Sequence, residues 1–177
     1  MNRKNFITST ALGISVFSII PLLGHHKLKG GIANDPKIVR NKDGSILNVM
    51  GDNQNIKLTG EDTNGQYTLI EQNNDPGVGI PPHIHENEDE VFQVLSGNVE
   101  MTIGNENTTL NAGDLIFCPK GVPHSWKVVG HQKARAMLSI FPAGLEHMFK
   151  ELSLLPPGPP DLEKVGQICG KYKLRFV

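Results

Sequence analysis

The chain has 177 residues, an apolar content of 38%, a charged content of 20% and a formal net charge of −1. This length allows one domain with a hydrophobic core and is short for two. The near-neutral charge and the lack of a long basic run argue against binding to nucleic acid or to an anionic surface. The 19 glycines and 12 prolines are scattered, which is typical of short strands joined by tight turns.

Residues 1–24 differ from the rest in composition. A basic start, MNRKNF, precedes the apolar run ITSTALGISVFSIIPLLG, which is the pattern of an export signal. The stretch NRKNFIT also resembles a twin-arginine signal with Lys4 in place of the second arginine, so the folded and unfolded export routes both stay open. We predict a signal peptide and a periplasmic or extracellular protein. The alternative is an uncleaved membrane anchor.

Residues 25–40 are polar, contain glycine and predict a linker. From 41 to 142, short apolar runs such as VFQVL and ARAMLSIF alternate with turn sequences such as TNG, NNDPG and NAGD. Strands at this spacing predict an all-β antiparallel sandwich or barrel. No run after the first 24 residues is long and apolar enough to cross a bilayer, so we expect no stable membrane insertion after cleavage.

Residues 143–177 predict a C-terminal helical extension. One helix face is formed by Leu145, Met148, Phe149 and Leu152. Asp161 is placed to cap a second helix that runs through Cys169, and KYKLRFV predicts a short final strand. The edge strands and these helices could mediate a homodimer.

The two cysteines, Cys118 and Cys169, lie far apart in the sequence. They could form a disulfide in an exported protein. Cys118 falls in an apolar strand-like run and Cys169 in a helical one, so we favour two buried free thiols.

The stretch PPHIHENEDEVF contains two histidines separated by one residue. In an extended strand, His83 and His85 face the same side. The strand pattern resumes at Glu90, which then shares the inward side with Phe92 and Val94. A carboxylate in an apolar interior is unfavourable unless it is paired or bound to a metal. These three polar side chains therefore predict a metal site.

A later stretch, GDLIFCPKGVPHSW, places His124 at the start of another strand. The predicted ligand set is His83, His85, Glu90 and His124. Such nitrogen and oxygen donors suit divalent Fe, Mn, Co, Ni, Cu or Zn, whereas a closed structural zinc site would use thiolates. Four protein ligands leave a position for water, substrate or O₂ on a metal that prefers five or six.

Both stretches fit longer patterns. G-x5-H-x-H-x4-E-x6-G matches Gly77, His83, His85, Glu90 and Gly97, and G-x5-P-x-G-x2-H matches Gly113, Pro119, Gly121 and His124. These patterns resemble the two conserved motifs of the cupin superfamily in its single-domain form. The resemblance implies a cupin-type jelly-roll β-barrel that holds a metal inside. More loosely, LTGEDTNGQYTLIE and PAGLEHMFKELS resemble quercetin 2,3-dioxygenase-like cupins.

This resemblance predicts a metal-dependent dioxygenase acting on a small phenolic or flavonol-like substrate. Glu90 is the candidate catalytic base, with a pKa that the apolar barrel should raise. The alternatives are a non-catalytic metal-dependent small-molecule-binding protein and a sugar or keto-acid isomerase. A sugar site needs polar side chains that face the cavity, and Gln93 and Ser139 are the exceptions in mostly apolar strands, with Gln93 expected to face outward.

The remaining candidates have simpler interpretations. We expect Glu86, Glu88 and Asp89 on a solvated loop and His131 and His147 on the surface. A larger apolar set either lines a pocket for an aromatic ligand or forms plain core. Its members are Phe92, Val94, Met101, Phe117 and Trp126.

Overall fold

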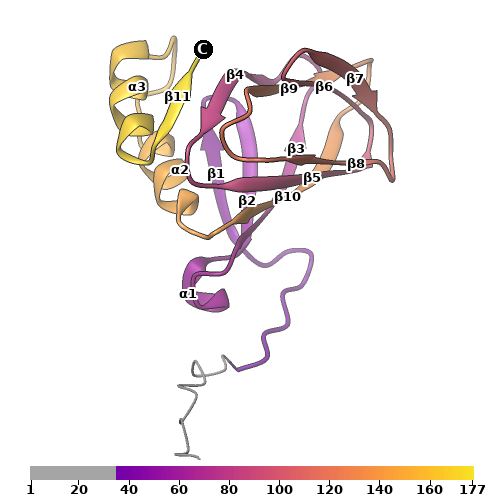
Figure 1. The fold of residues 1–177 in the computed structure, drawn as a ribbon. Helices are drawn as coiled ribbons and strands as arrows, with labels where there is room; N and C mark the ends of the chain where they lie inside the picture. Colours follow the sequence, from indigo (N-terminus) through magenta and orange to yellow (C-terminus); the bar gives the residue numbers. More distant parts are fainter. Residues whose placement is uncertain (1–34) are drawn as a thin grey trace, which may run out of the picture. The chain divides into compact units, whose positions relative to one another are not determined.

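The computed structural model describes residues 35–177, so the predicted signal peptide and most of the predicted linker lie outside the described residues. Two antiparallel sheets face each other (Figure 1). The strands of the first sheet, in spatial order, are β1 (Ser45–Val49), β2 (Asp52–Leu58), β3 (Thr68–Asn74), β10 (Ala134–Phe141), β5 (Asp89–Ser96) and β8 (Leu115–Cys118). The strands of the second are β11 (Leu174–Phe176), β4 (Gly79–His85), β9 (His124–Val129), β6 (Asn98–Ile103) and β7 (Glu106–Leu110). The predicted all-β architecture is confirmed, with two sheets that do not close fully into a cylinder.

The alternation of side chains along β5 determines which of them reach the space between the sheets. Glu90, Phe92 and Val94 are buried, while Val91 and Gln93 between them are half-buried on the other face. This alternation places the inward-facing side chains of β5 as predicted. Other members of the core are Ile70, Leu138 and Ile140 from the first sheet and Val99, Met101 and Val128 from the second.

Gly97 joins β5 to β6 with a φ of +76°. A Cβ atom at this position would lie 2.5 Å from the backbone oxygen of Lys133, so a side chain would clash with the neighbouring loop. Positive φ values recur at the other glycines of the two sequence patterns, Gly77, Gly113 and Gly121. The glycines of the patterns therefore take backbone conformations typical of turns.

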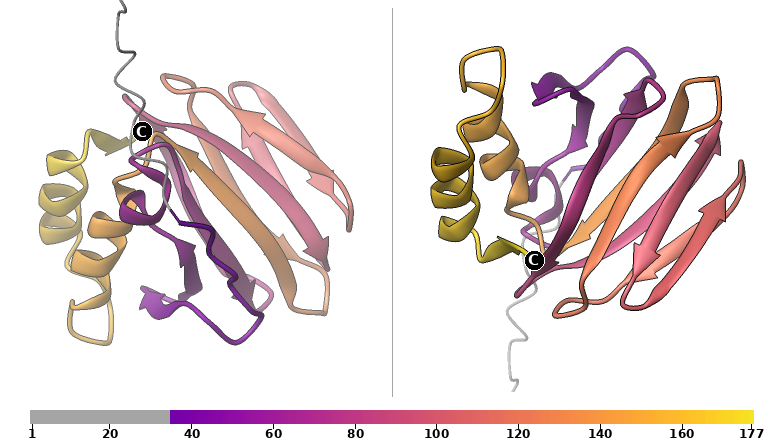
Figure 2. Two further views of the ribbon diagram at one scale, coloured as in Figure 1. Left: turned by 90° about the horizontal axis from the view of Figure 1, so that it is seen from below. Right: turned by 90° about the horizontal axis from the view of Figure 1, so that it is seen from above.

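The C-terminal residues form α2 (Leu145–Ser153), α3 (Leu162–Lys171) and β11, which we call the C-terminal cover. Helix α2 buries Leu145, Met148 and Leu152 on the predicted face, and the Asp161 side chain caps α3 by accepting a hydrogen bond from the Lys164 N–H at 3.1 Å. Figure 2 shows both helices together on one side of the sheets. Strand β11 pairs with β4, so the cover extends the second sheet.

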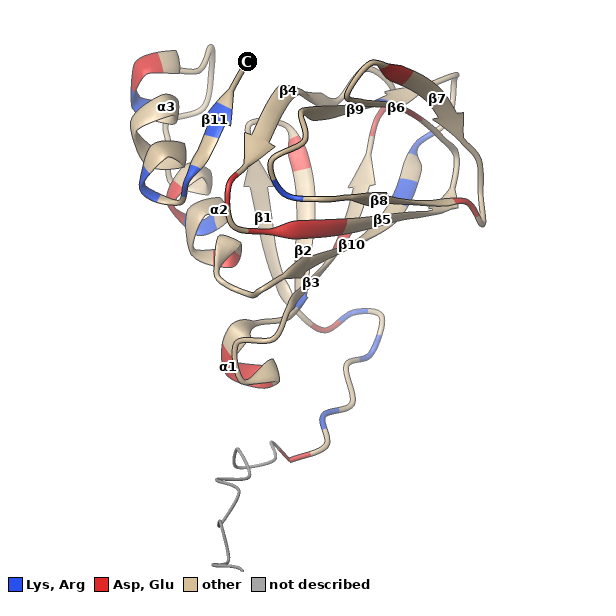
Figure 3. Cartoon of the chain, in the orientation of Figure 1, with Lys and Arg blue, Asp and Glu red and all other residues tan. Residues whose placement is uncertain are grey.

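One short helix, α1 (Gly60–Thr63), was not expected from the sequence. It begins with a capping box, in which the side chains and backbones of Thr59 and Asp62 bond reciprocally. Four residues are too few to produce helical periodicity, which is why the pattern missed it. No helix between residues 35 and 177 is long and apolar enough to span a bilayer. Charged residues are scattered over the described part of the chain, with acidic residues at the start of β5 (Figure 3).

Candidate metal centre

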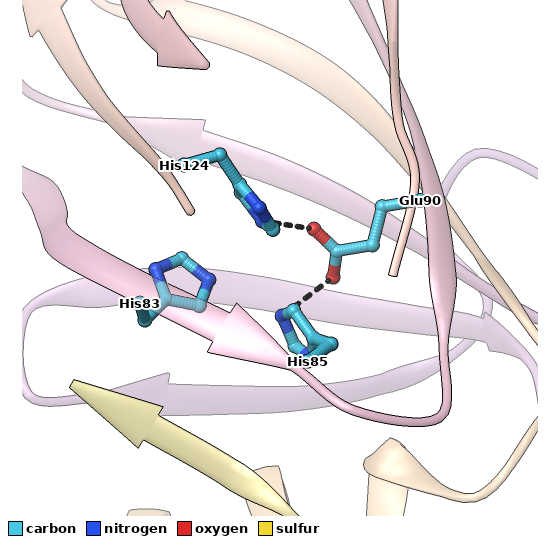
Figure 4. Close-up of side chains that lie close together, drawn as sticks. All are labelled: His83, His85, Glu90 and His124. Carbon is cyan, nitrogen blue, oxygen red and sulfur yellow. Dashed lines mark hydrogen bonds and ion pairs between the residues drawn. The ribbon is translucent and has the colours of Figure 1, made fainter. Parts of the chain in front are cut away.

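The four predicted ligands come together between the sheets (Figure 4). His83 and His85 lie on β4, Glu90 near the start of β5 and His124 at the start of β9. All four are buried, and one donor atom from each lies within 4.8 Å of the others. The pairing of β4 with β9 sets His83 directly opposite His124, so sheet register brings two sequence patterns to one point.

Backbone carbonyls orient two of the three imidazoles. Nδ1 of His83 lies 2.9 Å from the carbonyl oxygen of Pro81, and Nδ1 of His124 lies 3.1 Å from that of Val122. A carbonyl oxygen only accepts, so both Nδ1 atoms carry the proton. Nε2 of the neutral His83 presents a lone pair, whereas Nε2 of His124 donates to Oε2 of Glu90 at 3.2 Å and would have to lose this proton to bind a metal. A metal bound at Nε2 requires the tautomer with the proton on Nδ1.

His85 has no hydrogen-bond partner on either ring nitrogen among the described residues, although it is buried. Its Nε2 lies 3.5 Å from Oε1 of Glu90, and its Nδ1 lies 3.8 Å from Oε2 of Glu88. The expectation of a solvated Glu88 is wrong, because the short loop before β5 turns this side chain inward beside His85. Two buried nitrogens without partners are unusual in a folded protein, and they indicate that something else binds here.

Burial and the neighbouring ionisable groups both shift the pKa values of the residues in the site. Burial lowers the pKa of His83 to about 4, with help from the neighbouring His124, so its imidazole is neutral at pH 7. Burial also lowers the pKa of His124, but the hydrogen bond and negative charge of Glu90 outweigh it, and the net pKa is raised. Burial raises the pKa of Glu90, yet the hydrogen bond from His124 and the nearby imidazoles lower it below its usual value. The expected raised pKa of Glu90 is therefore wrong, because the histidines dominate over the apolar wall.

The donors fit a divalent transition metal. Ligand atoms about 2.1 Å from a metal and at right angles to each other lie about 3.0 Å apart. Nε2 of His124 lies 3.2 Å from Oε2 of Glu90, and Nε2 of His85 lies 3.5 Å from Oε1. Three imidazoles, which bind a metal in the neutral form, and one carboxylate are donors that several such metals accept, so the donor set does not select one of them.

A cavity of about 50 Å³ adjoins the cluster and is lined by His83, His85 and Glu90. Its apolar wall comes from both sheets and from the C-terminal cover, through Ile80, Trp126, Leu138, Met148, Phe149 and Phe176. Trp126 thus lines the cavity as one of the predicted candidates. Phe92, Val94 and Met101 are core instead, and Phe117 is 53% exposed on the outer face.

Residues 71–141, which include all four predicted ligands, match the family model described as Cupin domain. This part of the chain is a cupin domain. Over 77 residues, or 44% of this chain, the sequence is 29% identical to the quercetin 2,3-dioxygenase of Bacillus subtilis (strain 168). The aligned part spans 23% of that relative, so most of its length has no counterpart in the match.

Solved structures resemble the cupin domain in fold. KdgF from Halomonas sp. superposes with a TM-score of 0.55 and 19% identity, over 63% of this chain and 98% of that one. A predicted oxalate decarboxylase from Thermotoga maritima gives a TM-score of 0.55 and 21% identity, over 59% of this chain and 98% of that one. These likenesses support the jelly-roll fold and carry no information on the reaction.

Both cysteines are buried free thiols, as expected. Cys118 pairs in register with Glu90, and burial together with the charge of Glu90 raises its pKa to about 12. Burial raises the pKa of Cys169 to about 11, and this residue lines the cavity from α3. Both thiols are protonated at neutral pH and are poor metal ligands there.

Sequence reasoning missed a polar group in the same cavity. Asp52, Gln54 and Gln72 line it from β2 and β3, although the strands were expected to offer few inward polar side chains. Ser139, which was expected to face inward, lies on the outer face between the buried Leu138 and Ile140. The sequence does contain an indication of this group, because Asp52 and Gln54 lie four and two residues before the buried Ile56 and therefore face the same side of the strand.

His131 and His147 are exposed, as expected. Of the three acidic residues expected on a solvated loop, only Glu86 is fully exposed. Asp89 is half-buried, and its Oδ1 accepts a hydrogen bond from the Lys120 N–H at 2.9 Å. The loop before β5 is thus tied to the turn that follows β8.

Proposed function

We propose that this cupin is a metal-dependent dioxygenase that acts on a small phenolic or enol-type substrate. The observation that carries the proposal is the convergence of three imidazoles and one carboxylate on a single point beside an apolar cavity. A substrate bound there would reach the metal through an ionised hydroxyl. The resemblance to a quercetin 2,3-dioxygenase over 77 residues supports the same reaction class.

The residues of the chain have separate tasks in this proposal. His83, His85 and His124 would hold the metal, with the Nδ1 protons of His83 and His124 fixed by carbonyl oxygens. A divalent metal supplies Lewis acidity, which lowers the pKa of a hydroxyl bound to it. Glu90, a carboxylate at neutral pH, accepts the hydroxyl proton at Oε1 or Oε2. The apolar wall excludes water from the reacting atoms.

The size of the cavity restricts the substrate. A cavity of about 150 Å³ holds benzene, and one water needs roughly 10–15 Å³. The cavity of about 50 Å³ therefore admits a few waters, and an aromatic ring enters only after the C-terminal cover shifts. Met148 lines the cavity from the cover, and an unbranched thioether adapts its shape more readily than a branched side chain. A three-ring flavonol needs a larger displacement than a single phenol.

A second candidate is a sugar or keto-acid isomerase, or a protein that binds such a ligand without reaction. The observation that favours it is the inward-facing group of Asp52, Gln54 and Gln72. The sequence had predicted strands with mostly apolar inward side chains, which argued against a sugar site. These functions need the metal but consume no O₂.

Oxygen uptake separates the candidates. The purified protein is stripped of metal and reloaded separately with Fe(II), Mn(II), Co(II), Ni(II), Cu(II) and Zn(II). A flavonol, simple phenols and a small enolisable dicarbonyl are then added in an oxygen electrode. Uptake that depends on metal, disappears in His83→Ala and persists in the exposed control His131→Ala would establish the dioxygenase. If protein that is shown to contain metal consumes no O₂ with any of these substrates, the dioxygenase proposal is contradicted and the second candidate is favoured.

We also propose that the protein is exported, on the composition of residues 1–24, and that it forms a homodimer through a sheet edge or the C-terminal cover. Protease protection of the chain in intact cells tests the first proposal. Light scattering of the purified protein tests the second.

A further inference from the structure

Asp52 is the centre of a buried polar network on β2 and β3. Its Oδ2 accepts hydrogen bonds from Nε2 of Gln54 and Nε2 of Gln72, both at 2.8 Å, and its Oδ1 accepts one from Nδ2 of Asn74 at 2.6 Å. All four side chains are buried. The network fixes the orientation of both glutamine amides, because their nitrogens must face the carboxylate.

The two amide oxygens of these glutamines are left without donors. Oε1 of Gln54 and Oε1 of Gln72 are buried and have no hydrogen-bond partner among the described residues. Each glutamine is 3% exposed, so bulk water does not satisfy them. A buried carbonyl without a donor is unfavourable, and two adjacent ones on a network this well ordered indicate that a donor is supplied from outside the chain.

Both glutamines line the cavity that adjoins the metal centre. Strand β10 lies between β3, which carries Gln72, and β5, which carries Glu90, so the two polar regions are separated across the first sheet. The wall between them is apolar, with Leu138 of β10 at its middle. The cavity therefore has a candidate metal-binding region and a second polar region whose unpartnered atoms are the two glutamine acceptors.

We propose that Gln54 and Gln72 bind a hydroxyl group of the ligand at the end remote from the metal. Building on the proposed function, this names the substrate class as one with a second hydroxyl in addition to the one that meets the metal. An anionic group would be repelled by two carbonyl oxygens beside a carboxylate. A neutral hydroxyl supplies the missing donor and is small enough for a narrow cavity lined by apolar side chains.

Binding of matched phenols tests the inference without any turnover. The full chain is loaded with Zn(II), which has no redox chemistry, and titrated calorimetrically with phenol, the three dihydroxybenzenes, their monomethyl ethers and the aminophenols. The best dihydroxybenzene should bind at least about tenfold tighter than phenol and than its own methyl ether, which keeps the oxygen but lacks the proton. Equal binding within this set, tighter binding of an aminophenol, or no binding of any phenol would overturn the proposal.

Replacing one of the two glutamine acceptors gives an independent test. In Gln72→Met the preference for the second hydroxyl should fall to about one, whereas Gln93→Met, on the outer face of β5, should keep it. A preference that survives in Gln72→Met would also overturn the proposal, and the ligand comparison in the unaltered protein stands even where this variant does not fold. Oxygen uptake is not part of this test. A clear preference for the second hydroxyl, together with no oxygen uptake, would therefore contradict the dioxygenase proposal and support the role of Gln54 and Gln72. Oxygen uptake without this preference would support the dioxygenase proposal and contradict the role of the two glutamines.

Discussion

Nδ1 of His85 lies 3.8 Å from Oε2 of Glu88, and both side chains are buried. The other two histidines of the cluster donate from Nδ1 to backbone carbonyls, whereas Nδ1 of His85 has no hydrogen bond and Glu88 is the carboxylate that lies beside it. A carboxylate that accepts a hydrogen bond from Nδ1 holds the ring and makes its Nε2 a better donor to a metal. We predict that Glu88 closes this contact and positions His85 when a metal binds, a role that the loop sequence ENED did not reveal.

Removing Glu88 should weaken metal binding. We expect Glu88→Ala to lower the affinity for Zn(II) or Co(II) about 10- to 100-fold, because His85 loses the partner that orients it. Competition with a chromogenic chelator measures the affinity. The matched control is Glu86→Ala, an exposed carboxylate two residues away, which should bind metal as the unaltered protein does. Equal affinities for the two variants would show that Glu88 does not position His85.

Glu90 should be required for turnover more strictly than for metal binding. Glu90→Gln keeps an oxygen donor but removes the negative charge and the proton acceptor, so turnover should be lost while much of the metal stays bound. Elemental analysis after gel filtration, together with oxygen uptake, gives both quantities. Glu106→Gln on the exposed strand β7 is the control. Complete loss of metal from Glu90→Gln would restrict Glu90 to a ligand role.

Glu146 should make stability depend on pH in the acid range. Its carboxylate accepts hydrogen bonds from the N–H groups of Gly60 and Gly144, at 2.8 and 2.7 Å, and from the hydroxyl of Thr68. Burial raises the pKa of Glu146, but these bonds outweigh it and the net pKa lies below the usual 4.5. The stabilisation is therefore present above about pH 4.5 and is lost as pH falls through the lower folded pKa.

The Glu146→Gln variant isolates this effect. It should unfold with a free energy lower by about 1–3 kcal/mol at pH 7, because an amide N–H₂ now faces backbone donors. The difference from the unaltered protein should shrink as pH falls below 4. Urea denaturation at several pH values measures it, and Glu163→Gln, an exposed residue of α3, provides the comparison. A difference that stays constant from pH 7 to pH 3 would contradict the assigned role.

The C-terminal cover should open before an aromatic ring can enter. Cys169 lines the cavity from α3, so its reaction with a thiol reagent reports opening. In a Cys118→Ala background we expect slow labelling that accelerates in Glu146→Gln, since Glu146 ties α2 to α1 and β3. Mass spectrometry of the labelled protein follows the rate. Immediate labelling of the otherwise unaltered cover would show that the cavity is open in solution.

The clustering of the four candidate ligands was predictable because these residues are few, polar and regularly spaced. His83 and His85 share one strand face, and the register of β4 against β9 then brings His124 to them without any further information. The motifs that resemble cupins therefore carried both the fold and the grouping of the four side chains, whose binding of a metal stays a prediction. Helix α3 was predictable for a similar local reason, since Asp161 caps it and the proline-rich link precedes it.

The rest of the cavity depends on tertiary context that a single sequence does not show. Gln54 and Gln72 are ordinary strand residues until the pairing of β2 with β3 sets them directly opposite each other on the inner face. The pKa of Glu90 was expected to rise because burial was considered without the imidazoles that surround it. Glu88 became buried only because the loop before β5 folds back toward the second sheet.

Strand β4, which carries two of the predicted ligands, has both of its neighbours far downstream in the chain. It pairs with β9 on one side and with β11 on the other, where Phe176 is opposite His83 and Leu174 is opposite His85. Pairing over such sequence separations is slow compared with local structure. We expect the ion to be acquired at the end of folding, in whichever compartment folding finishes. An unfolded export route would then expose the nascent site to the metals outside the cytoplasm, and a folded route would load it before the chain crosses the membrane.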